Sequence, residues 1–123
     1  MPRLIKILFV TTTFFSYIEG IHSQTMVKYI ESEIHDMIYK DSQSWKASTY
    51  IHNSVNINDA ESEGKKIIVK GTFIANITQW PFRGKRTINF TAEAKQVLDD
   101  ITIKKVYWTQ PITELYWCIG DCN

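Results

Sequence analysis

Residues 67–95, IIVKGTFIANITQWPFRGKRTINFTAEAK, decide the fold class, because apolar and polar residues alternate on both sides of a short basic and aromatic segment. A period of two places apolar side chains on one face of a β-strand and polar side chains on the other. The residues expected to face a core are Ile67, Val69, Gly71, Phe73, Ala75, Ile77, Ile88, Phe90, Ala92 and Ala94. The stretch therefore predicts an antiparallel hairpin with one buried face.

The hairpin turn is predicted as a four-residue loop from Pro81 to Gly84. Proline presets φ for the start of a type I turn, and glycine takes the left-handed conformation that ends such a loop. This loop sets Ile77 opposite Ile88 and Phe73 opposite Ala92. A slip by one residue would place apolar residues opposite polar ones, so the face of each strand is strongly specified.

The same turn has a second interpretation, as a binding tip. Its candidate partner-binding residues are Trp80, Phe82, Arg83, Lys85 and Arg86. Exposed aromatic and basic side chains at a loop tip are suited to bind an acidic partner or anionic headgroups. In the alternative, the aromatic rings fold back on the end of the sheet and the cations only solvate the turn.

Outward from the hairpin, residues 24–46 predict a helix, with an apolar stripe formed by Val27, Ile30, Ile34, Met37, Ile38 and Trp45. Asp41 falls within this stripe; either the helix ends near Lys40 or the acid points into a pocket. The period of two returns from Ser48 to Asn58, which predicts a first strand, and residues 58–64 read as an acidic turn. A last strand is predicted at 101–109, with a bulge at Lys104–Lys105.

These elements predict an α+β fold in which one N-terminal helix packs on a curved four-stranded antiparallel meander. Over residues 24–110 this order of elements resembles the cystatin-like and NTF2-like arrangement. Protease-inhibiting cystatins would show a Q-x-V-x-G type central loop, whereas this chain has Trp80-Pro-Phe-Arg-Gly84. Inhibition is therefore not supported. NTF2-like proteins include isomerases, secretion-machine components and plain binding domains, so the resemblance does not choose among these functions.

Residues 1–23 resemble a secretory signal peptide in composition. Arg3 and Lys6 precede an apolar run of about 12 residues, and Gly20 and Ser23 follow it. The run is shorter than the roughly 20 residues that span a bilayer as a helix. We therefore expect an exported protein, periplasmic or extracellular, with a single domain at 24–123; a buried first strand and an uncleaved anchor are the alternatives.

Charge and cysteine content limit the function further. Without residues 1–23 the chain holds 12 basic and 12 acidic residues, and a neutral domain is not typical of a nucleic-acid binder. Cys118 and Cys122, in CIGDC, predict a C-terminal tail closed by a disulfide in an oxidising compartment. Free thiols are one alternative. A metal site is the other, although the spacing has no second cysteine or histidine pair beside it. No metal or other cofactor is expected.

No catalytic motif stands out. His22, His35 and His52 have no acid or nucleophile attached to them by spacing. One enzymatic hypothesis pairs a buried carboxyl base, Asp41 or Glu31, with a tyrosine such as Tyr50 or Tyr107.

The favoured interpretation is a small exported, non-enzymatic domain that binds a protein partner, such as a component or accessory of an envelope or secretion assembly. The alternative is an NTF2-like pocket protein that binds or isomerises a small ligand. A homodimer formed through outward apolar residues, Tyr50 and Ile74 among them, is a third hypothesis.

Overall fold

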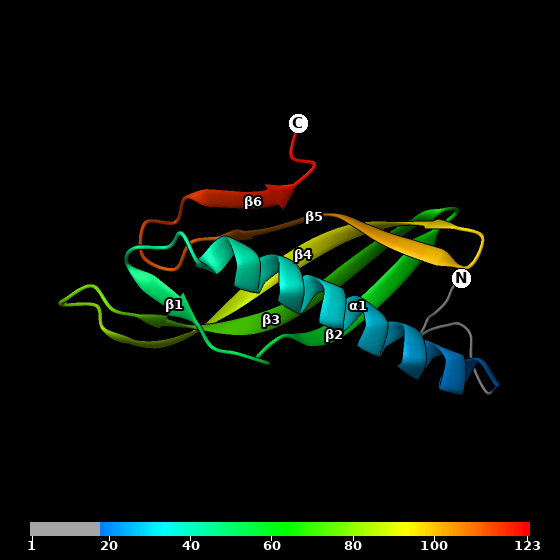
Figure 1. Ribbon diagram of the computed structural model, residues 1–123, viewed down its shortest axis with the longest axis horizontal. Coiled ribbons are helices and arrows are strands. Elements are labelled where there is room, and N and C mark those ends of the chain that lie inside the picture. Colours follow the sequence, from blue (N-terminus) through cyan, green and yellow to red (C-terminus); the bar gives the residue numbers. More distant parts are fainter. Residues whose placement is uncertain (1–17) are drawn as a thin grey trace.

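The computed structural model describes residues 18–123, with side chains from residue 25. One helix precedes six strands (Figure 1). Their bounds are α1 (Ile18–Ser42), β1 (Ser48–Tyr50), β2 (Asn56–Glu63), β3 (Lys66–Ile77), β4 (Gly84–Val97), β5 (Asp100–Thr109) and β6 (Tyr116–Gly120). Residues 1–17 of the predicted signal peptide lie outside the described residues, and residues 18–23 form the first turns of α1. The export signal stays a prediction.

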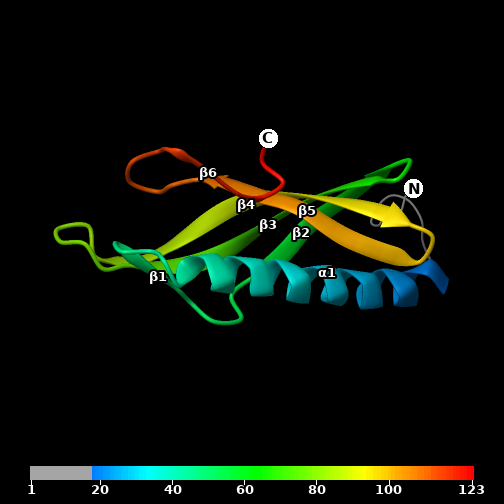
Figure 2. The ribbon, with the colours of Figure 1, turned by 45° about the horizontal axis from the view of Figure 1, so that its top comes forward.

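The strands form one antiparallel sheet that is curled like half a barrel. Strands β2 to β6 follow one another as a meander, and β1 pairs with the end of β3, on the same side as β2. The helix runs along the sheet and covers one of its faces (Figure 2). The predicted α+β class, with one helix on a curved antiparallel sheet, is confirmed; the predicted number of four strands is wrong.

The two extra strands have different origins. The predicted first strand is divided: residues 51–55 leave the sheet, with Asn53 at a φ of 60°, and β2 then runs through the predicted acidic turn to Glu63. A polar sequence forms a strand here because β2 lies at an edge, where one side faces solvent. Strand β6 lies in the predicted C-terminal tail, where its five mostly exposed residues leave no alternation to recognise.

The helix begins earlier and ends earlier than the predicted 24–46. Its buried stripe is Ile30, Ile34 and Ile38, exposed by 2%, 0% and 0%. Trp45 lies three residues beyond the last helical residue, and its indole still packs against the core. The predicted stripe is thus correct in its centre, while Trp45 reaches the core from the turn that follows α1.

The hairpin register differs from the prediction by four residues. Ile77 pairs with Gly84 and Phe73 pairs with Ile88, so the loop spans the six residues 78–83. Beyond Ile77 the chain stays paired only on its β1 side, where the Thr78 amide donates to the carbonyl of Ala47, and the Phe82 amide then closes a turn on the Gln79 carbonyl. An even shift leaves every side chain on its predicted face, and Phe73, Phe90 and Ala92 are buried as expected.

The core is centred on Phe73, which is fully buried between α1 and the sheet. Its ring lies 5.0 Å from that of Trp108 and 6.3 Å from those of Phe90 and Trp45. The bulge predicted in the last strand is also present, since Glu93 pairs with Lys105 and Ala94 with Ile103. The residue between, Lys104, is the extra one, and it restores the inward direction of Val106 and Trp108.

The predicted Cys118–Cys122 disulfide is present, with a Cα–Cα distance of 6.0 Å. It joins β6 to the end of the chain across Gly120, whose φ of 98° favours glycine. The bridge therefore holds the segment that follows the last strand.

Candidate functional site

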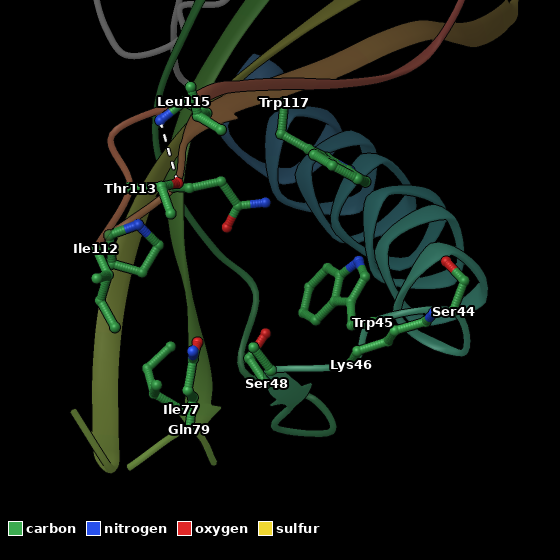
Figure 3. Close-up of a pocket in the computed structure, with 13 residues that line it drawn as sticks. Ser44, Trp45, Lys46, Ser48, Ile77, Gln79, Ile112, Thr113, Leu115 and Trp117 are labelled. Carbon is green, nitrogen blue, oxygen red and sulfur yellow. Dashed lines mark hydrogen bonds between the residues drawn. The ribbon is translucent and has the colours of Figure 1, made fainter. Parts of the chain in front are cut away.

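An open groove lies at the end of the molecule where four segments meet: the exit from α1, β1, the end of β3 and the loop between β5 and β6 (Figure 3). Its volume is about 380 Å³. The lining residues are Ser44, Trp45, Lys46, Ala47, Ser48, Ile77, Gln79, Gln110, Pro111, Ile112, Thr113, Leu115 and Trp117. Apolar carbon dominates this lining, and Gln79, Gln110 and the hydroxyls supply polar groups along it.

Two tryptophans on the helix side of the groove share one acceptor. The indole Nε1 atoms of Trp45 and Trp117 each donate to Asp41 Oδ2, both at 2.9 Å. Trp45 follows α1 and Trp117 belongs to β6, 76 residues from Asp41 in sequence, and Figure 3 shows the two indoles one above the other. The carboxylate thus fixes the orientation of two large aromatic faces from segments that are far apart in the sequence.

Asp41 is otherwise poorly suited to its position. It lies in the last turn of α1, where a negative charge opposes the helix dipole by roughly 0.3–1 kcal/mol. The two hydrogen bonds are only partly shielded from water, so each contributes about 0.5–1 kcal/mol, and together they offset the unfavourable dipole. The helix continues to Ser42 rather than ending near Lys40, and the acid is an acceptor at the margin of the groove.

The β3–β4 loop extends the site beyond the groove. Gln79 belongs to the groove lining, and the next residues expose two large aromatic side chains, Trp80 by 78% and Phe82 by 46%. The loop is ordered by its own backbone, since the amide of Phe82 donates to the carbonyl of Gln79 at 2.9 Å. The hairpin therefore presents its aromatic side chains on a defined turn that projects from one end of the sheet (Figure 1).

The five predicted partner-binding residues are divided by the structure. Trp80, Phe82, Arg83 and Lys85 are exposed on the loop and at its base. Arg86 is half-buried: its Nη2 donates to the Phe82 carbonyl at 3.1 Å and its Nη1 to the Lys85 carbonyl at 3.2 Å. Arg86 therefore braces the loop, while the other four side chains remain accessible.

The charges around this end are mostly positive. Lys46 belongs to the groove lining and Arg83 and Lys85 belong to the adjoining hairpin. The carboxylate of Asp41 is occupied by the two indoles, and Glu114 is exposed in the β5–β6 loop. An apolar groove with cations along its border is suited to an apolar group that has carboxylates beside it.

A second cluster, on the other side of α1, brings together histidines that the sequence left separate. His35 Nδ1 lies 2.6 Å from the Tyr50 hydroxyl, and the rings of His35 and His52 have their centroids 4.6 Å apart. Burial raises the pKa of Tyr50 above its ordinary value of 10.0, and hydrogen bonds with Ser54 oppose that shift. A pocket of about 280 Å³ adjoins the cluster, lined by Lys28, Glu31, Ser32, His35, Asn53 and Val55.

The enzymatic hypothesis that pairs Asp41 with a tyrosine finds no such contact, because Asp41 Oδ2 accepts from the indoles of Trp45 and Trp117. Tyr107 instead donates to Glu93 Oε2 at 3.3 Å, and burial followed by the charge of Glu93 raises its pKa. The prediction that Tyr50 points outward as part of a dimer face is wrong, since its ring packs against that of Phe73 with centroids 6.0 Å apart. Strands β1 and β3 are antiparallel, and Tyr50 pairs with the buried Ala75, so both point inward.

Within the described part of the chain, no three His, Cys, Asp or Glu side chains come together in a way that could hold a metal ion. In residues 18–123 no helix combines the length and the apolar character needed to cross a bilayer. No protein-family model, curated protein or solved structure matches the chain.

Proposed function

We propose that this protein is a small exported, non-enzymatic domain that binds a protein partner through the groove and the adjoining hairpin. The observation that carries the proposal is the pair of indoles from Trp45 and Trp117, held by Asp41 beside an open groove of about 380 Å³. Aromatic side chains with fixed orientation lose little conformational entropy on binding, which is why they dominate many interfaces.

The partner that fits is a segment with one or two apolar side chains next to carboxylates. The apolar group would fill the groove against the indoles and Ile112, and Trp80 and Phe82 would cover its outer side. Lys46, Arg83 and Lys85 would then face the carboxylates. Burial of apolar area supplies the affinity, and the cations supply orientation and a faster association.

Export is part of the proposal. The Cys118–Cys122 bridge is compatible with an oxidising compartment, periplasmic or extracellular. A helix along a curled antiparallel sheet is also the arrangement that we associate with cystatin-like and NTF2-like folds, and we propose this finer assignment with it. Such folds serve binding as well as catalysis, so the groove, and not the fold, supports the proposed function.

The test uses short peptides that carry Leu or Phe between two Asp residues, and matched peptides with Lys in place of Asp. Tryptophan fluorescence and calorimetry measure binding to the protein and to two variants, Trp117→Ala and the double variant Phe82→Ala/Arg83→Ala. We expect both variants to bind the acidic peptides at least 10-fold more weakly. Lys65→Ala, in the turn at the other end of the sheet, is the control. Equal affinity for all four proteins would refute the proposal.

A second candidate function is supported by the short His35–Tyr50 contact beside the pocket of about 280 Å³. Here the protein would bind or isomerise a small ligand, one of the functions found among NTF2-like proteins, with His35 and Tyr50 as the polar groups. Nuclear magnetic resonance with a fragment library distinguishes the two candidates. Ligand-induced shifts at His35 and Asn53 that vanish in Tyr50→Phe would favour the small-ligand pocket.

A further inference from the structure

The end of the sheet that lies opposite the groove carries the kind of segment that the groove fits. The β4–β5 turn exposes Val97 by 47% and Leu98 by 90%, and two acidic residues, Asp99 and Asp100, follow immediately. Both views place this turn and the β3–β4 hairpin at opposite ends of the molecule (Figures 1 and 2). The chain thus presents an apolar-acidic turn at one end and an apolar-basic groove at the other.

Leu98 is a poor choice for the turn itself. It is the first of two residues between the paired Val97 and Asp100, and its φ of 57° belongs to the left-handed region that glycine or asparagine fills with less strain. Its side chain is almost fully in water, so it stabilises the fold little by burial. Neither the turn nor the core therefore requires a leucine at this position.

We propose that the Leu98–Asp100 turn of one copy docks into the groove of a second copy. This inference rests on the proposed function and names the partner as this same chain. Leu98 would enter the groove against Trp45 and Trp117. Asp99 and Asp100 would lie toward Lys46 and the hairpin cations. The side chain of a leucine is well within the size of a groove of about 380 Å³.

The charge complementarity rests on the turn itself. Strand β2 brings the exposed acidic residues Asp59, Glu61 and Glu63 to this end of the sheet, but they are balanced by exposed lysines of the same region: Lys65, Lys66, Lys70 and Lys95. Asp99 and Asp100 are therefore the charges that would meet the cations of the groove. Added salt should weaken the contact between copies, because the charges are exposed and the screening length is only about 10 Å at 0.1 M ionic strength.

The symmetry of such an assembly follows from the positions of its two surfaces. A contact between different surfaces is heterologous, and it produces a ring or an open chain instead of a closed two-fold dimer. A contact made by one turn and one groove is small, so it belongs with weak, transient interfaces. The expected behaviour is a mean mass that keeps rising with concentration past that of two chains.

Sedimentation velocity of the protein between about 10 µM and 1 mM tests this, with affinities in the range of weak contacts. Three variants accompany it: Leu98→Gly, the double variant Asp99→Lys/Asp100→Lys, and Trp117→Ala. We expect each variant alone to remain a monomer. Leu98→Gly should unfold at the same temperature as the protein or higher, because glycine relieves the positive φ.

The decisive experiment mixes two of these variants. Leu98→Gly keeps an intact groove and Trp117→Ala keeps an intact turn, so an equimolar mixture should form a one-to-one complex that neither variant forms alone. A dimer through the sheet faces would stop at two chains and persist in Leu98→Gly, which would overturn the inference. So would a protein that stays monomeric at 1 mM. If that monomer still bound the acidic peptides, the proposed function would stand and only self-association would fail.

Discussion

Replacement of Asp41 by alanine removes the acceptor that both indoles share. Each hydrogen bond to the carboxylate would contribute about 1.5–3 kcal/mol if it were buried. Trp117 is 38% exposed, and the freed indole donors can bond to water, so about 0.5–1 kcal/mol for each bond is a better estimate. Removal of a negative charge from the end of α1 returns roughly 0.5 kcal/mol. We therefore expect a net loss of about 1 kcal/mol and a Tm lower by roughly 4 °C.

The assay combines urea unfolding with the emission spectrum of the folded protein. In Asp41→Ala the tryptophan emission should shift toward that of solvated indole. The loss of binding free energy for an acidic peptide should exceed the loss of unfolding free energy. Asp41→Asn keeps an oxygen that can accept both bonds and should lie between the two. Asp36→Ala, an exposed acid of the same helix, is the matched control. If Asp41→Ala matched Asp36→Ala in stability and in emission, the shared acceptor would not hold the groove.

Three further predictions concern the stability of the fold. A Cβ at Gly71 would lie within 2.8 Å of the Phe90 ring and would collide with the Asn56 carbonyl oxygen, so Gly71→Ala should lower the free energy of unfolding by about 2–3 kcal/mol in urea. Because burial raises the pKa of Tyr50 in the folded state, the contribution of Tyr50 to stability should be constant below pH 10 and fall above it. Tyr50→Phe should reduce the fall in Tm between pH 9 and 11, while the raised pKa of Tyr107 leaves part of that fall in place. Replacement of both cysteines by serine should cost at most about 2 kcal/mol, because the bridged residues are only 4 apart, and hydrogen exchange should rise in β6 but not in β3.

Much of the fold can be predicted from local sequence patterns. The alternation in residues 67–95 predicted which side chains of β3 and β4 are buried, because that depends on the period of two alone. The register was not readable in the same way, since any even shift satisfies the pattern. The observed register leaves residues 78–83 outside the pairing of β3 with β4, and within them the Phe82 amide closes a turn on the Gln79 carbonyl.

The candidate site was readable only in part. The exposed hairpin residues Trp80, Phe82 and Arg83 could be named because they interrupt the alternation. Trp117 could not be placed, since β6 is short and its residues show no period. The one available signal was Asp41, an acid on an apolar stripe near a helix end, where charge is unfavourable unless something compensates it.

The helix, the buried faces of the central hairpin, the bulge and the disulfide could all be predicted from local sequence, because each depends on residues within a few positions of one another. The groove formed by the exit from α1, β1, β3 and the β5–β6 loop could be found only in the folded molecule, since its lining residues are as far apart in sequence as Ser44 and Trp117. The tertiary structure also decided that the exposed Leu98 turn and this groove occupy opposite ends. The sequence separation of two segments does not show whether they come into contact. The packing of α1 across the curled sheet decides which segments lie together.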